Sequence, residues 1–253
     1  MIIGLSGYIG SGKDTVGMLI QALTMMEGSR WRNEPLEYVK AYGGQPNVKG
    51  GWEIKKFAEK LKQIASMMTG IPREKFEDQE FKNTYLSEEW GAQAAVNMAH
   101  KDKIDFEKYK VTTDLPLGFK NAIRLMTVRE FLQKLGTEAI RDGLHKNAWV
   151  NALFADYKYQ HTSQAGPLEC FPNWIITDVR FPNEAKAIKD RGGIVVRIER
   201  MKSADLKDGP GGTQLHPSET SLDDWKFDYI INNNGSLEQL LGATKTLLNN
   251  MEN

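Results

Sequence analysis

The stretch of this 253-residue chain that decides its fold is Gly7-Tyr8-Ile9-Gly10-Ser11-Gly12-Lys13-Asp14-Thr15. It matches the pattern G-x-x-x-x-G-K, with the hydroxyl residue one place later than usual. The apolar residues 1–6 predict a strand before it, and the apolar spacing of residues 16–23 predicts a helix after it. A glycine-rich loop in this position can wrap an anion with its backbone N–H groups, and the helix N-terminus adds a positive dipole. We therefore predict a site for nucleotide phosphates.

The side chains of the loop have different predicted roles. The residues that we expect to contact the nucleotide are Gly7, Gly10, Ser11, Gly12, Lys13, Asp14 and Thr15. Lys13 is expected to reach the β- and γ-phosphates. Asp14 stands where this loop commonly has the Mg²⁺-binding Ser or Thr, so Thr15 is the candidate for the hydroxyl's role. Asp14 then either holds a magnesium-bound water or favours the helix N-terminus, as any carboxylate of the first turn does. A turn that merely joins strand to helix would leave Lys13 unexplained.

A second apolar run, residues 174–177, ends in an acid and predicts a buried strand. Asp178 would lie at the carboxyl end of this strand, beside the phosphate loop of a doubly wound sheet, and could bind magnesium directly or through water. Arg180 is placed to contact phosphoryl oxygens. The competing interpretation is a helix-capping Asp178 with a surface Arg180. Because the loop at Gly7 is present, we favour the functional interpretation.

The order of the predicted elements indicates an α/β fold with a doubly wound parallel sheet flanked by helices, in one domain over residues 1–253. Residues 70–147 form a helical insertion in this scheme, with helical stretches near 88–99, and the Gly- and Lys-rich residues 201–217 form a lid. Residues 28–51 have no sustained hydrophobic period and predict a surface excursion, that is, an irregular segment on the outside of the domain. The remaining predicted strands span 52–57, 194–199 and 229–232, and the remaining predicted helices span 58–69, 127–144, 150–159, 183–191 and 236–250.

Several cations of the insertion and of the helix after it could bind an acceptor phosphate. Cations are needed there because two phosphate groups must be brought together against their mutual repulsion. The candidates are Arg73, Lys82, Arg129 and Arg141. Gln133 lies one turn after Arg129 and could contact a base edge. His216 precedes Pro217 in a loop, where a histidine is usually structural.

Composition excludes several classes of protein. Acidic and basic residues balance at 33 each, which argues against a protein that coats nucleic acid, and the pair Lys55-Lys56 is isolated. Cys170 is the one cysteine, so no internal disulfide can form, and no His/Cys cluster has zinc-ligand spacing. No apolar run approaches the roughly 20 residues of a membrane span. We expect a soluble, cytoplasmic protein.

Taken in order, a set of motifs resembles a known family. They are the loop Ser6 to Thr15 with its Gly-Lys-Asp-Thr ending, Phe57-Ala58 with Leu61-Lys62, Arg129, Leu132, Leu135-Gly136-Thr137, Trp149-Val150, Asp178-Val179-Arg180 and residues 232–240. In these the chain resembles the deoxynucleoside monophosphate kinases of tailed bacteriophages, which are P-loop kinases related to nucleoside monophosphate and dephospho-coenzyme A kinases. Residues 28–51 are longer than the family usually has.

The resemblance implies ATP and Mg²⁺ as co-substrate and metal, with Asn233 and Gly235 near the adenine. It implies that the acceptor is a deoxynucleoside monophosphate, bound by Lys62, Arg73, Lys82, Arg129 and Gln133, and that Asp14, Thr15 and Asp178 are the metal candidates. A homodimer in the host cytoplasm fits the family, without a membrane or a stably bound nucleic acid.

The expected reaction is in-line transfer of the γ-phosphoryl group to the acceptor phosphate, with Lys13, Asp178 and Arg180 as catalytic residues. Two other functions stay open. One is a kinase of a hydroxymethylated base in DNA, which would need duplex DNA and a carboxylate base. The other is a nucleotide-dependent switch protein, which would hydrolyse slowly and form no phosphorylated product.

Overall fold

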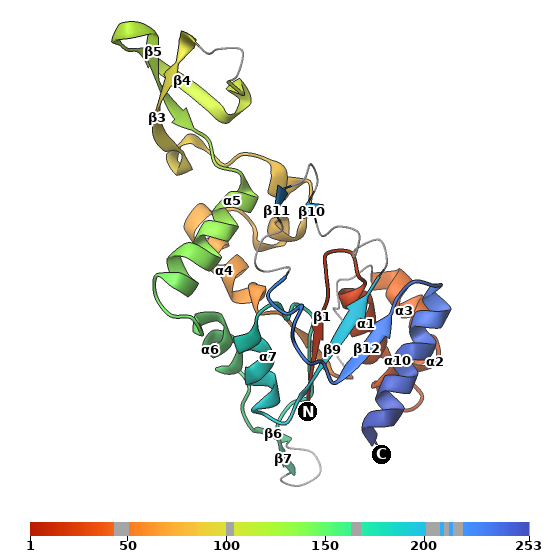
Figure 1. Ribbon diagram of the computed structural model, residues 1–253. Coiled ribbons are helices and arrows are strands. Elements are labelled where there is room, and N and C mark those ends of the chain that lie inside the picture. The colour runs from red at the N-terminus through yellow and green to blue at the C-terminus, as the bar shows by residue number, and fades with distance from the viewer. Residues whose placement is uncertain are drawn as a thin grey trace. The chain divides into compact units, whose positions relative to one another are not determined.

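The computed structural model describes residues 1–42, 51–99, 104–162, 168–200, 208–209, 213–214 and 220–252 (Figure 1). The chain divides into two compact units. The first, here called the sheet unit, comprises Met1–Glu59 and Trp149–Asn253, and the second, the inserted unit, comprises Lys60–Ala148. The predicted insertion, residues 70–147, falls within the inserted unit.

The sheet unit is built on five strands, β1 (Ile2–Ser6), β2 (Glu53–Lys55), β8 (Trp174–Ile176), β9 (Ile194–Glu199) and β12 (Tyr229–Asn232). Their order is β12-β9-β1-β8-β2, and every neighbouring pair is parallel. The glycine-rich loop follows β1, the central strand. The prediction of a parallel central sheet is therefore confirmed, and each of its expected strands is present.

Helices cover both faces of this sheet (Figure 1). They are α1 (Lys13–Leu23), α2 (Arg30–Asn33), α3 (Pro35–Tyr42), α6 (Ala148–Phe154), α7 (Pro182–Lys189) and α10 (Leu237–Glu252). Side chains alternate between two cores: Ile2 packs with residues of α7, and Ile3 packs with residues of α1 and α10. A strand that is buried on both faces has no polar alternation, which is why these short apolar runs were recognisable as parallel strands.

The prediction of a surface excursion over residues 28–51 is wrong for its described part. Residues 30–42 form α2 and α3, and α3 packs against α1. Tyr38 is fully buried, and its hydroxyl donates to Gln21 Oε1 at 2.5 Å. The helical pattern was obscured by polar residues and short elements, because the apolar contacts come mainly from the aromatic side chains Trp31, Tyr38 and Tyr42. Residues 43–50 lie outside the described part.

The inserted unit has its own small core, formed by Ala65, Phe76, Leu86, Val128 and Phe131. Its helical segments are α4 (Ala58–Thr69), which begins in the sheet unit, the 3₁₀ turns η1 (Arg73–Glu77), η2 (Phe81–Asn83), η3 (Glu88–Trp90), η5 (Phe106–Lys108) and η6 (Pro116–Gly118), the helix α5 (Val128–Gln133) and the π-helix η7 (Lys134–Asp142). The prediction of a helix over residues 127–144 is confirmed, because α5 runs into η7. Thr127 and Glu130 start this helix with a reciprocal capping box.

The predicted helical stretch near residues 88–99 is wrong. After η3 the chain forms β3 (Ala92–Asn97), which pairs antiparallel with β5 (Phe119–Arg124) beside β4 (Tyr109–Asp114). Alanine favours a helix locally, but pairing with β5 buries Val96 and Ala122, and this tertiary contact overrides the local preference.

Two pairs of short strands complete the described chain: β6 (Gln160–Thr162) with β7 (Leu168–Cys170), and β10 (Asp208–Gly209) with β11 (Thr213–Gln214). Of the predicted lid, residues 201–217, the described part is limited to β10 and β11, and the rest, including His216, lies outside it. Among the helices of the described residues, none has the length and apolar character needed to cross a membrane.

Candidate functional site

The loop between β1 and α1 depends on glycine for its backbone path. Gly10 and Gly12 have φ angles of 76° and 100°, which side chains with a Cβ rarely adopt. A Cβ at Gly12 would overlap Asn233 Nδ2, and a Cβ at Gly7 would overlap the Ile198 carbonyl oxygen. The glycines are therefore required by the contacts of the loop with β9 and with the turn after β12, as well as by its curvature.

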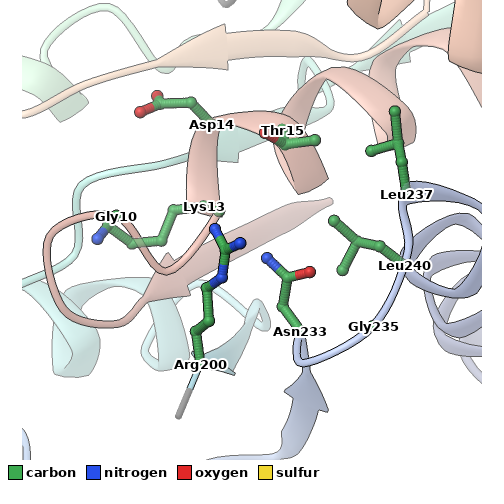
Figure 2. A pocket seen from close by; sticks show the side chains of 10 residues that line it. Gly10, Lys13, Asp14, Thr15, Arg200, Asn233, Gly235, Leu237 and Leu240 are labelled. Carbon is green, nitrogen blue, oxygen red and sulfur yellow. The ribbon is translucent and has the colours of Figure 1, made fainter. Parts of the chain in front are cut away.

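Lys13 is folded back over the loop. Its Nζ donates to the carbonyl oxygens of Gly7 at 2.5 Å and Tyr8 at 2.8 Å, and the residue is buried. Figure 2 shows its side chain extending toward Gly10 along the pocket. A positive charge held in this place, next to the N-terminus of α1, favours an anion.

The hydroxyl group of Ser11 supports the same conclusion. Ser11 Oγ is fully buried and has no hydrogen-bond partner within the described part of the chain. A buried hydroxyl without a partner is costly, so this atom is suited to a polar ligand. The Ser11 carbonyl is satisfied, because Asn233 Nδ2 donates to it at 2.8 Å.

Gly10, Gly12, Lys13 and Asn233 border a pocket with a volume of about 410 Å³ (Figure 2), whereas Ser11, whose hydroxyl is buried, is not among the residues that line it. It is lined by Gly10, Gly12, Lys13, Asp14, Thr15, Arg200, Asn233, Gly235, Leu237 and Leu240. The first turn of α1 and the turn after β12 are thus brought together, although they are distant in sequence. Leu237 and Leu240 form an apolar wall on the α10 side of the pocket.

Arg200, Leu237 and Leu240 are pocket residues that sequence reasoning missed, and Arg200 is the charged one. It directly follows β9, and β9 lies beside β1, so the parallel order brings the end of β9 near the phosphate loop. The signal that could have found Arg200 is its position directly after a predicted parallel strand. The same signal identified Asp178. The order of the strands, which the sequence does not state, decides which of these positions reach the pocket.

Asp14 has two close partners outside the loop. Lys56 Nζ lies 2.9 Å from Asp14 Oδ1, and the Thr177 hydroxyl donates to the same oxygen at 3.0 Å. Asp14 is exposed and Thr15 is partly buried, and both line the pocket. Their oxygens are ligands that Mg²⁺ accepts.

Asp178 follows β8 as predicted, and its carboxylate caps a helix. Its two oxygens accept hydrogen bonds from the backbone N–H groups of Phe57 at 2.8 Å and Ala58 at 2.9 Å, at the start of α4. Burial raises the pKa of Asp178 above the usual aspartate value, although these two hydrogen bonds act in the opposite direction. Neither Asp178 nor Arg180 is among the residues that line the pocket. Their catalytic roles stay predictions.

Within the inserted unit, the predicted acceptor-binding cations gather around one acid that sequence reasoning missed. Lys62 Nζ and Arg73 Nη2 contact the two carboxylate oxygens of Glu77 at 2.6 and 2.7 Å. Lys82 Nζ donates to the Glu77 carbonyl at 3.4 Å. Lys62 is buried although it is charged. Glu77 therefore holds Lys62 of α4 beside Arg73 of its own turn, η1; the spacing of four between Arg73 and Glu77 is visible in the sequence, whereas the contact with Lys62 is not.

Of the other acceptor candidates, Arg129 and Gln133 are exposed and Arg141 is half-buried. Arg129 Nε donates to Asn83 Oδ1 at 3.2 Å, beside Lys82. Gln133 is exposed at the end of α5, and Arg141 lies in η7. The structure thus groups Arg129 with the Glu77 cluster through η2, and its contacts give Gln133 no specific role.

Comparison with known proteins adds information from outside the structure. Residues 77–243 match the family model described as deoxynucleotide monophosphate kinase. The chain is 26% identical over 148 residues to the deoxynucleotide monophosphate kinase of Enterobacteria phage T4, covering 58% of this chain and 55% of that protein. It is 32% identical over 132 residues to an Acanthamoeba polyphaga mimivirus protein with the same kinase in its name, covering 49% of this chain and 62% of that protein.

A protein of Escherichia phage RB69, also called deoxynucleotide monophosphate kinase, is 24% identical over 145 residues. The matched stretches span between 53% and 62% of the length of these relatives. The family model matches residues that begin after the phosphate loop, so the geometry of the loop is an independent observation.

Proposed function

The chain belongs to the deoxynucleotide monophosphate kinase family, and we propose that it transfers the γ-phosphoryl group of ATP to a deoxynucleoside monophosphate. In this reaction an oxygen of the acceptor 5′-phosphate forms a bond to the γ-phosphorus as the bond from that phosphorus to the β–γ bridging oxygen breaks. The products are ADP and a deoxynucleoside diphosphate. The observation that carries the proposal is the phosphate loop, with the left-handed backbone of Gly10 and Gly12 and the folded Lys13 on the pocket wall.

The donor nucleotide occupies the pocket at the loop in this proposal, as in a P-loop kinase. The loop amides and the N-terminus of α1 hold the phosphates, and Lys13 leaves the Gly7 and Tyr8 carbonyls to contact them. Leu237 and Leu240 supply an apolar wall for the base, near Asn233 and Gly235. Arg200 adds a positive charge on the same pocket.

The residues present fit a magnesium ion. The ligand candidates are the carboxylate of Asp14 and the hydroxyl of Thr15, which are hard oxygen donors on the pocket wall, with Asp178 as a more distant candidate. When bound, the ion neutralises charge on the phosphoryl groups. Lys56 and the Thr177 hydroxyl hold one oxygen of Asp14 and leave the other for this role.

The acceptor phosphate is bound by the cations of the inserted unit. Lys62 and Arg73 are held by Glu77, so their positions are set before the substrate arrives. Two cations share one carboxylate, and an excess of positive charge suits a dianionic phosphate. Arg129 and Lys82 extend this cluster, and Gln133 is the candidate for contact with the base.

Catalysis in this proposal comes from positioning and charge neutralisation, with no covalent intermediate. A phosphate acceptor is already ionised near neutral pH, so a strong general base is not needed. Lys13 contributes directly to transition-state stabilisation. Asp178 contributes by holding the start of α4, the helix that carries Lys62, and Arg180 by contacting phosphoryl oxygens.

The test is a coupled ADP-release assay with ATP, Mg²⁺ and each of the four deoxynucleoside monophosphates in turn, with products identified by chromatography. Diphosphate formation that depends on the acceptor is the expected result, and it gives the base preference directly. ADP release without a phosphorylated product would favour a nucleotide-dependent switch. Phosphorylation of hydroxymethylated duplex DNA, with no reaction of the monophosphates, would favour a DNA-base kinase.

A further inference from the structure

A buried arginine lies beside the phosphate loop and has no place in the proposed chemistry. Arg197 is on β9, paired with Ser6 at the end of β1, and its side chain is 8% exposed. Its Nη2 contacts Asp223 Oδ1 at 3.1 Å. Its guanidinium also lies over the rings of Tyr8, at 4.7 Å, and Phe227, at 5.5 Å. Arg197 is therefore enclosed by one acid and two aromatic rings.

Tyr8 closes this cluster from the side of the loop. Its hydroxyl lies 2.8 Å from each carboxylate oxygen of Asp223 and donates to that carboxylate. A hydrogen bond to an ionised acceptor is stronger than one between neutral groups. Burial and the nearby Asp223 carboxylate raise the pKa of Tyr8, so the hydroxyl keeps its proton at neutral pH. The Asp223 side chain is 39% exposed, and its neighbour Leu222 is buried in the core that contains Ile2 and residues of α7.

The backbone of Tyr8 takes part in the phosphate site. Its carbonyl oxygen accepts from Lys13 Nζ at 2.8 Å and from the Ser11 N–H at 3.2 Å. The side chain and the carbonyl of Tyr8 thus connect Asp223 to the Ser11 amide, a contact that does not depend on where Lys13 points. Asn233 holds the other end of the loop through the Ser11 carbonyl.

The charges in this cluster determine which residue holds which in place. A guanidinium buried in the protein must be paired, and Asp223 supplies the opposite charge. The aromatic faces add cation–π attraction. Arg197 therefore fixes Asp223, and Asp223 fixes Tyr8.

We propose that Tyr8 and Asp223 are positioning residues that hold the phosphate loop in its anion-binding conformation, with Arg197 as the buried cation that keeps Asp223 in place. The inference rests on the proposed nucleotide site. A loop that is already in its binding conformation binds phosphates without the entropy cost of ordering the loop. Loss of the hydrogen bond between Tyr8 and Asp223 should therefore weaken binding of the donor nucleotide.

The experiment compares Tyr8→Phe with Tyr159→Phe by titration calorimetry with ADP and Mg²⁺. Tyr8→Phe removes the hydroxyl and keeps the ring over Arg197, whereas Tyr159 is exposed and lies outside the pocket lining. We expect the dissociation constant for ADP to rise about tenfold in Tyr8→Phe and to stay unchanged in Tyr159→Phe. In kinetics, KM for ATP should rise while KM for the acceptor does not.

A double-mutant cycle separates positioning from a general loss of stability. If the two groups act through one contact, Asp223→Asn combined with Tyr8→Phe weakens ADP binding no further than Asp223→Asn alone. ADP affinity of Tyr8→Phe within twofold of wild type would overturn the inference, even if the melting temperature falls. Wild-type protein that does not bind ADP would instead overturn the proposed function.

Discussion

The two units of this chain form their candidate sites in different ways. In the sheet unit, the candidate phosphate site is made mostly of backbone: glycines, the amides of the loop and the first turn of α1. In the inserted unit, the candidate acceptor site is made of long side chains, Lys62 and Arg73, which converge on Glu77 from different elements.

The difference affects both recognition and stability. A backbone site requires particular residues at consecutive positions, so it leaves a motif. A side-chain site requires only that several charges meet in space, so it leaves scattered cations that look like surface residues. The sheet unit also has cores on both faces of its sheet, whereas the inserted unit relies on one small core and short 3₁₀ turns.

The strongest way to test the comparison is Lys13→Ala. Because Lys13 acts by charge on the β- and γ-phosphates in our proposal, turnover should fall by about 10² to 10³ fold or more. The coupled ADP-release assay measures this. The matched control is Lys40→Ala on α3, whose exposed ion pair with Glu37 should be dispensable. Turnover retained in Lys13→Ala would reject the site.

The next largest effect is expected for Gly12→Ala. The added methyl group would overlap Asn233, and the φ of 100° is unfavourable for alanine, so the loop must move. We expect ATP affinity to fall by about tenfold or more, measured by calorimetry. Gly28→Ala is the control for backbone strain alone, since its φ is 83° and its Cβ would meet no atom within 4 Å. Equal ATP affinity in both variants would show that the contact with Asn233 is unimportant.

A smaller and selective effect is expected in the inserted unit for Lys62→Met. This change keeps the length of the buried side chain and removes its charge, so the Glu77 carboxylate loses its contact with Lys62 and keeps the one with Arg73. KM for the deoxynucleoside monophosphate should rise about tenfold, while KM for ATP stays the same. Lys75→Met, at an exposed position of η1, is the control. An equal rise in both KM values would mean that the cluster does not select the acceptor.

The smallest effect is expected for Tyr38→Phe, which tests whether α3 is part of the core of the sheet unit. Loss of the hydrogen bond to Gln21 should lower the free energy of unfolding by about 1 to 2 kcal/mol and leave both KM values unchanged. Denaturant unfolding measures the difference. Unchanged stability would place α3 outside the cooperative core.

The same variant has a pH signature. Burial raises the pKa of Tyr38 to about 12. A raised pKa in the folded state stabilises the protein at pH values below the unfolded tyrosine pKa of about 10, and this contribution is lost as the pH rises toward the folded value. The stability difference between wild type and Tyr38→Phe should therefore shrink above about pH 10.

The prediction from sequence succeeded where local patterns and burial agree. The parallel strands, α1 and the helix over residues 127–144 were found because apolar runs and helical periodicity are local signals. It failed at α3, which is stabilised by aromatic contacts, and at β3, where pairing with β5 overrides a helical preference. For the candidate site, the predicted residues Gly10, Gly12, Lys13, Asp14 and Thr15 line the pocket, whereas Gly7 and Ser11 do not, and Arg200 and Glu77 were missed.

By itself, then, the sequence determined that a phosphate loop joins a buried strand to a helix, because the glycines, Lys13 and the flanking apolar runs are consecutive. Only the tertiary structure decided what surrounds the loop: Asn233 on the Ser11 carbonyl, Asp223 on the Tyr8 hydroxyl, and Asp178 on the first amides of α4. The physical reason is the distance along the chain between the interacting residues. Backbone conformation depends on neighbouring residues, whereas these hydrogen bonds join positions more than 100 residues apart, as for Phe57 and Asp178, 121 residues apart.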